Sequence, residues 1–264
     1  MSLLDSTFRR ALLAAGVFCG ASLAPTDAWA NDLLQFSDFR VTAQGGGDFV
    51  LEPSHMTTLT LEQTTGWNFG DVYWFVDQSW YANGPDASGN ASSWYGEFSP
   101  RLSFAKLSGR APGEGLIRDV LIAATLEHGR DARLTTAQLI GLGVDFNLPG
   151  MDYANANVYA RKQVHEGDFD TWQLTLAGAR HFSVGGQRFL VDGFIDYVAP
   201  GGSRHWNLHV SPQVKWDLGA RSGSPDRWYA GVELHYWKHK FGVAPIPGVK
   251  TTDETVGLIV QRRF

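Results

Sequence analysis

In several segments of this 264-residue chain, aromatic and charged residues occupy every second position. Tyr73, Phe75 and Asp77 follow one another in this way, and so do Phe194 and Asp196. An aromatic face can stack on a flat ring, and a carboxylate accepts hydrogen bonds from hydroxyl groups. The sequence therefore predicts a substrate-binding surface made of the following residues: Tyr73, Phe75, Asp77, Glu97, Arg101, Asp145, Tyr159, Arg161, Phe194, Asp196 and Trp237.

Patterns for catalysis and for metal binding are weaker. The chain contains no Gly-x-Ser-x-Gly segment, which is the usual setting of a nucleophilic serine in a hydrolase. His235 and His239 share one face if they belong to a strand, but the rise per residue places them ~13 Å apart there. We expect no catalytic residue, no metal and no cofactor.

Composition excludes several classes of protein. The 22 Lys and Arg residues against 27 Asp and Glu give a net charge of −5, which argues against a nucleic-acid partner. The aromatic content of 13% argues against disorder. Cys19 is the single cysteine, so no disulfide can form within the chain.

Residues 1–30 have the pattern of a cleaved export signal. Arg9 and Arg10 precede an apolar run over 11–24, and Ala28-Trp29-Ala30 is a small-x-small cleavage pattern. The alternative is an N-terminal membrane anchor, but the apolar run is shorter than the ~20 residues that span a bilayer. We expect a signal peptide over 1–30 and one β-barrel domain over 31–264.

Period-two alternation follows this segment along the chain. In 226–239, Trp228, Val232 and Leu234 share one phase, whereas Glu233 and His235 share the other. Successive side chains of a strand point to opposite faces, so this pattern predicts strands with one apolar and one polar face. The expected strands are 36–44, 55–65, 69–81, 93–107, 117–128, 136–147, 152–165, 169–183, 188–198, 205–218, 227–239 and 252–264.

Alternation alone does not separate a membrane barrel from a secreted sandwich or a lipocalin-like barrel. Two features favour lipid. Aromatic residues end many apolar phases, as in interfacial girdles: Trp74, Trp80, Trp172, Trp206, Trp216, Trp228 and Tyr236. The opposite phase carries many ions, each of which costs several kcal/mol to bury in a dry core: Asp71, Asp77, Glu97, Arg101, Asp145, Arg161, Asp192, Asp196, Lys215, Asp217 and Glu233. We predict an all-β fold, a transmembrane antiparallel up-and-down β-barrel of about twelve strands.

The connections and the C-terminus agree with this fold. Short turns at 65–68, 148–151 and 183–186 alternate with longer loops, although 108–116 and 219–226 are longer than the pattern requires. The expected long loops are 82–92, 129–135, 166–168, 199–204 and 240–251, of which 166–168 is short for its class.

Phe264 ends an apolar phase, and we expect the barrel-assembly machinery to recognise it. Arg262 interrupts that phase, although an arginine near a membrane edge can extend to the headgroups. Pro100 and Pro212 fall inside expected strands, where we expect a bulge or a strand end.

Several segments, in order, resemble the Tsx-like (OmpK-like) family of nucleoside-specific channels of the Gram-negative outer membrane. They are 67–77 (Trp-Asn-Phe-Gly-Asp-Val-Tyr-Trp-Phe-Val-Asp), 95–103 (Tyr-Gly-Glu-Phe-Ser-Pro-Arg-Leu-Ser), 141–145, 148–150, 158–162, 193–197 and 236–237. The chain departs from the family in its shorter external loops and its end, Arg262-Arg263-Phe264. The resemblance implies a monomeric, narrow twelve-stranded barrel that passes nucleosides and sometimes serves phage or colicins as a receptor.

The predicted binding residues suit a nucleoside. A ring that stacks on a base contributes roughly 1–3 kcal/mol, and carboxylates accept hydrogen bonds from ribose hydroxyls. Two alternatives remain. The first is an unselective small porin or structural barrel. The second is an outer-membrane lipid hydrolase, but His128 of the outward phase has no serine beside it to act as the nucleophile. For single residues, the rings can simply narrow the lumen, and Asp77, Asp145 and Asp196 can be solvated wall.

An ion network that braces the barrel is a further alternative for Arg161, and we favour it for Glu97 and Arg101.

Overall fold

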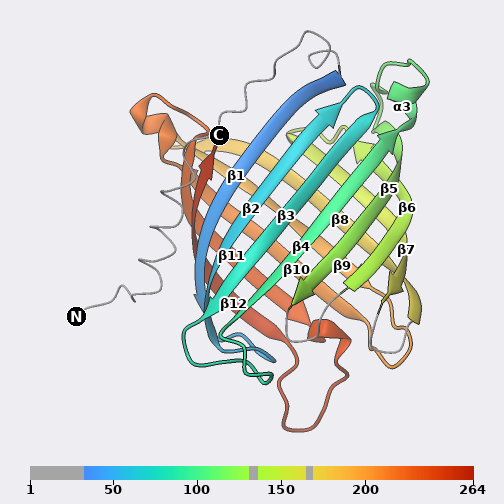
Figure 1. The fold of residues 1–264 in the computed structure, drawn as a ribbon. Coiled ribbons are helices and arrows are strands. Elements are labelled where there is room, and N and C mark those ends of the chain that lie inside the picture. The colour runs from blue at the N-terminus through green and yellow to red at the C-terminus, as the bar shows by residue number, and fades with distance from the viewer. Residues whose placement is uncertain (1–32, 131–135, 165–168) are drawn as a thin grey trace.

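The computed structural model describes residues 33–130, 136–164 and 169–264, which form twelve antiparallel strands and three short helices (Figure 1). The strands are β1 Leu34–Gly47, β2 His55–Trp67, β3 Gly70–Tyr81, β4 Ser92–Ser103, β5 Ile117–Arg130, β6 Thr136–Phe146, β7 Tyr153–Gln163, β8 Phe169–Val184, β9 Gln187–Val198, β10 Asn207–Asp217, β11 Trp228–Lys238 and β12 Asp253–Arg263. The helices are α3 Phe104–Leu107, η1 Gly219–Ser222 and η2 Lys240–Gly242. The export signal expected over 1–30 lies outside the described residues.

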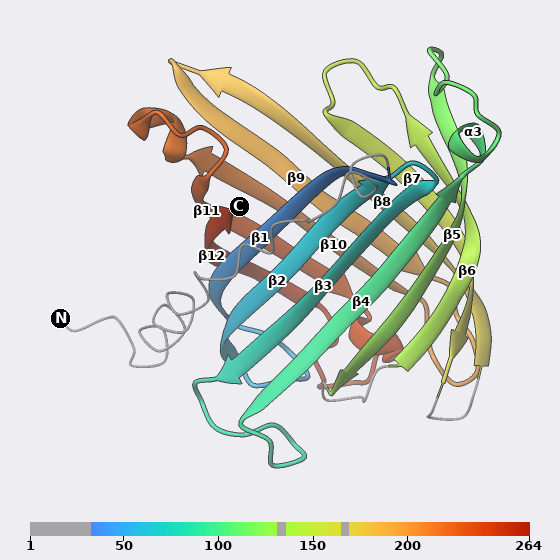
Figure 2. The same ribbon diagram turned by 45° about the horizontal axis from the view of Figure 1, so that its top comes forward.

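The strands close into a barrel, as predicted. Each strand pairs with the next along the chain, and β1 pairs with β12, with Arg40 opposite Arg263 and Gly45 opposite Leu258. Closure leaves no sheet edge with unpaired backbone groups. Strands β1–β4 form one wall and β8–β10 the wall behind it, and all of them slant across the cylinder (Figures 1 and 2).

The predicted alternation places apolar side chains outside. On β12, Val256 and Leu258 are 59% and 71% exposed, whereas Thr255 and Ile259 are 6% and 2% exposed. The same alternation follows the other strands, so the outer surface is an apolar band that suits the hydrocarbon core of a membrane. Among the described residues no helix is both long and apolar enough to cross a membrane.

The two ends of the barrel differ. The terminal end, where β1 begins and β12 ends, carries the connections 68–69, 104–116, 147–152, 185–186 and 218–227. The loop end carries, within the described residues, 48–54, 82–91, 199–206 and 239–252. The two long connections that the sequence places among the short turns, 108–116 and 219–226, therefore lie at the terminal end, where the structure has them as 104–116 with α3 and 218–227 with η1.

The strand expected over 93–107 is wrong beyond Ser103. Phe104–Leu107 turns into the short helix α3, and the Ser103 side chain accepts a hydrogen bond from the Lys106 backbone N–H as its N-cap. The Ser103 hydroxyl also donates to Asp119 of β5. This cap ends the strand although the apolar residues beyond it continue the pattern.

Both prolines lie within strands, with neither a bulge nor a strand end. The pairing of β4 with β5 is interrupted at Ser99–Pro100, and that of β10 with β11 at Ser211–Pro212, but the register is the same on either side. A proline lacks the backbone N–H that would bond to one neighbouring strand, but its pairing with the strand on the other side is kept. Pro100 still pairs with Val72 of β3, and Pro212 with Gly193 of β9. Opposite Pro212 stands Gly193 at φ +147°, where a Cβ would lie 2.3 Å from the Ser211 carbonyl oxygen.

The C-terminal Phe264 faces outward at 45% exposed, and its ring lies 5.7 Å from that of Phe39. The Arg262 guanidinium covers the rings of Trp228 and Phe264 at 4.8 and 5.2 Å. Cation–π contact thus accommodates the charge that interrupts the apolar phase. Recognition of Phe264 by the assembly machinery stays a prediction.

Candidate functional site

A cavity of about 320 Å³ opens inside the barrel toward the loop end, and we call it the chamber. All eleven predicted binding residues lie on inward-facing positions of their strands, but only seven of them line this cavity: Phe75, Asp77, Glu97, Arg161, Phe194, Asp196 and Trp237. Parts of three loop-end connections also line it, which is why it lies at this end: Phe49, Glu52, Arg204, His205, Lys240 and Phe241.

The other four predicted residues lie away from the chamber. Tyr73 donates a hydrogen bond from its hydroxyl to Glu62 at 3.3 Å. Arg101 is paired with Asp145 and with Asp71 near the terminal end, at 2.8 Å each. Tyr159 is 4% exposed and packs with Ala123, Ala137 and Leu139 in an apolar cluster on the inner wall. These four residues do not line the chamber, so their assignment to a solute site stays a prediction.

Aromatic rings form one wall of the chamber. The indole of Trp237 stacks on the imidazole of His209 with centroids 4.5 Å apart and planes 10° apart. Phe194 meets His209 edge-on at 4.9 Å, and Phe241 meets Trp237 at 4.8 Å. The indole N–H of Trp237 donates to the Asn207 side-chain oxygen at 3.2 Å, which holds the ring in place.

Sequence reasoning missed His209 and His235 as chamber residues. Both occupy the inward phase of β10 and β11, and their rings lie 4.5 Å apart, with His209 Nε2 3.4 Å from His235 Nδ1. The sequence considered histidines only as metal ligands, although the inward phase was the signal that could have found these two. The described residues hold no cluster of three or more groups able to bind a metal ion.

Four carboxylates of the chamber are held by neutral donors. Asp77 accepts from the Thr60 hydroxyl at 2.6 Å, and Asp196 from the Thr175 hydroxyl at 2.5 Å. Glu97 accepts from the Tyr95 hydroxyl at 2.7 Å.

Glu233, which the sequence placed on the inward phase but not in the site, accepts from the Ser211 hydroxyl and from Gln213 at 3.1 Å. Within the described parts of the chain no Lys or Arg nitrogen lies within 4.0 Å of any of these four carboxylates. Glu97 therefore makes no ion pair of that length among the described residues, and the bracing role that the sequence favoured for it stays a prediction.

Arg161 is a chamber cation that is paired with a carboxylate. Its two guanidinium N–H₂ groups donate to the two carboxylate oxygens of Glu127, one of them at 2.6 Å, and the first group also donates to Gln173 at 2.7 Å. Arg161 and Glu127 lie on β7 and β5, on either side of β6, and their side chains are 9% and 6% exposed. A bidentate pair of this kind fixes both side chains.

Lys240 is a chamber residue that sequence reasoning also missed, because it belongs to a connection expected to extend outward. It is 1% exposed, and its ammonium lies 2.5 Å from carboxylate oxygens of both Asp253 and Glu52. Three rings, those of Phe49, Trp237 and Phe241, surround it at 5.6, 5.3 and 5.3 Å. Left-handed backbone at His239 and Phe241, with φ of +49° and +57°, turns the connection inward.

Charges near the terminal end are paired with one another instead. We call this set the ion-paired network: Asp38, Arg40, Glu62, Asp71, Arg101, Asp145, Arg188, Asp192, Lys215, Asp217, Asp226 and Arg263. Lys215, 1% exposed, donates to Asp192 at 2.6 Å, and Asp192 also lies 4.0 Å from Arg40. Because Arg40 is on β1 and Asp192 on β9, the network joins strands that are not neighbours.

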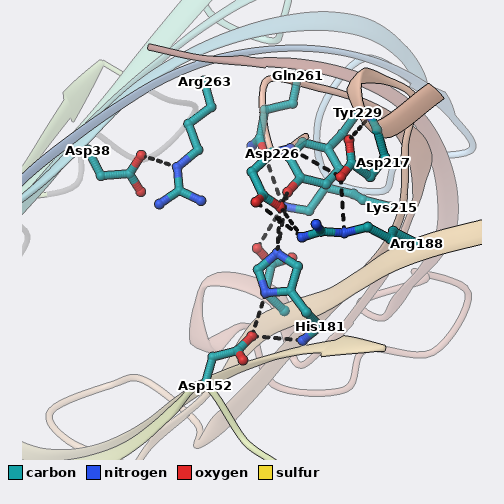
Figure 3. Close-up of polar contacts among 12 residues, drawn as sticks. Asp38, Asp152, His181, Arg188, Lys215, Asp217, Asp226, Tyr229, Gln261 and Arg263 are labelled. Carbon is teal, nitrogen blue, oxygen red and sulfur yellow. Dashed lines mark hydrogen bonds and ion pairs between the residues drawn. The ribbon is translucent and has the colours of Figure 1, made fainter. Parts of the chain in front are cut away.

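Figure 3 shows the part of this region nearest the terminal end. Arg188 donates to Asp226 at 2.9 Å and lies 3.5 Å from Asp217, while Arg263 donates to Asp38. Beside them, His181 contacts Asp152 at 2.7 Å through Nδ1 and the Tyr229 hydroxyl at 3.3 Å through Nε2.

Alternating strands, an apolar outer face and a chamber of rings and carboxylates are the features to compare with known proteins. A family model described as "Nucleoside-specific channel-forming protein, Tsx" matches residues 34–261. The chain belongs to this family. As a member of the Tsx family it is a protein of the bacterial outer membrane, and its barrel is that of a channel.

Two curated relatives of this Tsx-family chain are outer membrane proteins OmpK. OmpK of Vibrio parahaemolyticus is 24% identical over 190 residues, which cover 69% of each chain. OmpK of the serotype O3:K6 strain is 23% identical over 199 residues, covering 69% of this chain and 70% of the relative. Among solved structures, the KdgM porin aligns with a TM-score of 0.47 and 11% identity, over 86% of this chain and 99% of that one. The NanC porin aligns with the same TM-score and coverage at 8% identity.

The outward-facing His128 bears on the hydrolase alternative. Its ring lies 5.2 Å from that of Trp94, and its Nδ1 is 2.9 Å from the Thr136 hydroxyl. No serine hydroxyl is hydrogen-bonded to it among the described residues. The hydroxyl beside His128 is therefore that of a threonine, not of a serine.

Proposed function

We propose that this channel passes nucleosides by diffusion and that the chamber is where they bind. The observation that carries the proposal is the chamber itself, in which ring faces and hydrogen-bond acceptors converge on one cavity of about 320 Å³. Cavities that bind small molecules combine apolar and aromatic walls with a few convergent polar groups.

The base of a nucleoside is flat, and the chamber offers it rings from opposite walls. Phe75 of β3 and Trp237 of β11 both line the cavity, and Phe194 of β9 lies beside Trp237 through the shared contact with His209. Stacking on such rings contributes roughly 1–3 kcal/mol per base and tolerates different bases. The site therefore suits a class of solutes rather than one base.

The ribose of a nucleoside carries hydroxyl donors, and the chamber carboxylates carry acceptors. Asp77 and Asp196 use one oxygen each for a threonine hydroxyl, Thr60 and Thr175, which leaves lone pairs for a further donor. Such binding must remain weak enough for the solute to leave. We expect the loop end to face outward and the terminal end to face the periplasm, as in other outer-membrane barrels.

Single-channel recording in a planar bilayer tests the proposal. Adenosine and thymidine are expected to reduce the current in a saturable way, whereas a neutral sugar of similar size has a weaker effect that does not saturate. Equal, unsaturated effects of nucleoside and sugar would favour the unselective porin instead. A monomeric state and a receptor role for phage or colicins are further proposals drawn from the resemblance.

A further inference from the structure

We propose that the chamber also binds organic cations that carry an aromatic ring, such as benzyl ammonium compounds, and makes the channel select cations over anions. The inference rests on the proposed function in one respect only, that solutes enter the chamber. It does not depend on nucleosides being among them.

The first argument is the charge that the chamber leaves uncompensated. Asp77 and Glu97 lie on β3 and β4, and Asp196 and Glu233 lie on β9 and β11, so the carboxylates come from two opposed walls of the barrel. Their hydrogen-bond donors are hydroxyl and amide groups. Carboxylates that face one cavity create an electrostatic potential there that attracts cations and repels anions.

The basic side chains of the chamber do not cancel that potential. Arg161 is neutralised by Glu127, and Lys240 lies between Glu52 and Asp253. The Arg204 guanidinium donates to the Phe241 backbone carbonyl. Of the residues that line the chamber, six are carboxylates and three are Lys or Arg.

The second argument is independent of the first, because the wall of the chamber already binds an organic cation. The Lys240 ammonium is a primary amine held by two carboxylates and three ring faces, and it is 1% exposed. Trp237, one of these rings, also stacks on His209 inside the chamber. The same combination of rings and carboxylates, Phe75 and Phe194 with Asp77 and Asp196, lines the same cavity.

An organic cation with an aromatic ring satisfies both features of this surface. Its charge meets the carboxylates, and its face or methyl groups meet the rings, whose electron-rich faces attract cations. A small inorganic cation meets the first feature but not the second, so it passes without binding strongly.

The test uses the complete barrel folded in detergent and three compounds that each carry one benzene ring and differ in charge. Benzyltrimethylammonium is expected to bind saturably in isothermal titration calorimetry and to block the channel current, whereas benzyl alcohol binds at least tenfold more weakly and benzoate does not bind. Equal binding of all three compounds, or tighter binding of benzoate, overturns the inference. Calorimetry needs no conductance, so it tests the inference even if the barrel proves closed.

Variants then connect the binding to the carboxylates. In the double variant Asp77→Asn, Asp196→Asn, binding of benzyltrimethylammonium is expected to weaken about tenfold, and the ratio of K⁺ to Cl⁻ permeability from the reversal potential to fall by a similar factor. The control is Glu254→Gln, which removes one carboxylate charge from the outer face of β12 and is expected to change neither value. Unchanged binding in the double variant also overturns the inference.

The two proposals fail in different ways. If adenosine blocks the current and benzyltrimethylammonium neither binds nor blocks, the cation site is wrong and the nucleoside channel stands. If benzyltrimethylammonium binds and adenosine has no more effect than the sugar, the nucleoside proposal is wrong and the cation site stands.

Discussion

The two halves of the barrel interior contain the same kinds of charged residue but use them differently. In the ion-paired network, Lys215 meets Asp192 at 2.6 Å and Arg101 meets Asp71 and Asp145 at 2.8 Å. In the chamber, Asp77, Glu97, Asp196 and Glu233 meet hydroxyl and amide donors. A carboxylate that has a cationic partner holds the wall together, whereas we propose that one without such a partner is available to a solute.

The difference also has an energetic meaning. Removing one partner of a buried ion pair leaves an uncompensated charge and costs ~3–5 kcal/mol, whereas losing a hydrogen bond to a neutral donor costs ~1 kcal/mol. The comparison therefore predicts that substitutions in the network alter stability and that substitutions in the chamber alter solute binding.

The largest expected effect is that of Lys215→Met. Asp192, 9% exposed, would then keep only the distant Arg40 at 4.0 Å, and we expect the free energy of unfolding to fall by about 3–5 kcal/mol. Urea unfolding in lipid vesicles, followed by tryptophan fluorescence, measures this change. The double variant Lys215→Met, Asp192→Leu removes both charges and should recover most of the loss. A single variant as stable as the wild type would show that the network does not brace the barrel.

The second effect is on binding. Trp237→Ala removes the ring that stacks on His209, and we expect nucleoside block to weaken by about 1–3 kcal/mol, or roughly 5- to 150-fold. Concentration-dependent block in single-channel recordings gives the value. Trp172→Ala is the matched control, because Trp172 is 47% exposed on the outer face. Equal effects of the two substitutions would remove Trp237 from the binding surface.

A smaller effect on stability is expected when a chamber carboxylate is made neutral. Asp196→Asn keeps the shape of the side chain and can still accept from Thr175, so the free energy of unfolding should change by less than about 1 kcal/mol. Asp71→Asn, the matched substitution in the ion-paired network, should cost more because Arg101 loses a charged partner. The same urea experiment compares them, and a reversed order contradicts the proposed division of the interior.

The smallest effect concerns neither half of the interior and serves as a baseline. Arg262→Met removes a cation that covers Trp228 and Phe264 on the outer face, where such contacts contribute about 0.5–1 kcal/mol. We expect a loss of that size in urea unfolding and no change in block by nucleosides. A change in block would show that the outer face influences the chamber.

Much of the fold could be predicted from local pattern. The expected strand 205–218 is found as Asn207–Asp217 and the expected strand 188–198 as Gln187–Val198. A period of two depends only on neighbours in the chain, so it also placed every predicted binding residue on an inward position. The strand over 93–107 was predicted too long because the Ser103 cap is a hydrogen bond that apolar periodicity does not contain.

The composition of the site was less predictable. Asp77 and Asp196 share one cavity although 118 residues separate them in the chain, and Arg101 and Asp145 meet across the intervening strand β5. Which inward residues lie at the same height depends on the register between all twelve strands. Lys240 was missed for a similar reason, since an inward turn at positive φ is not visible in a pattern of residue types.

By itself, the amino-acid sequence determined that the strands alternate, which side chains point inward and that the outside is apolar, because each of these follows from positions two residues apart. Only the tertiary structure decided which inward carboxylates are paired with cations and which meet neutral donors. That division arises from closure of the barrel, which fixes the height and the partner of every inward residue at once.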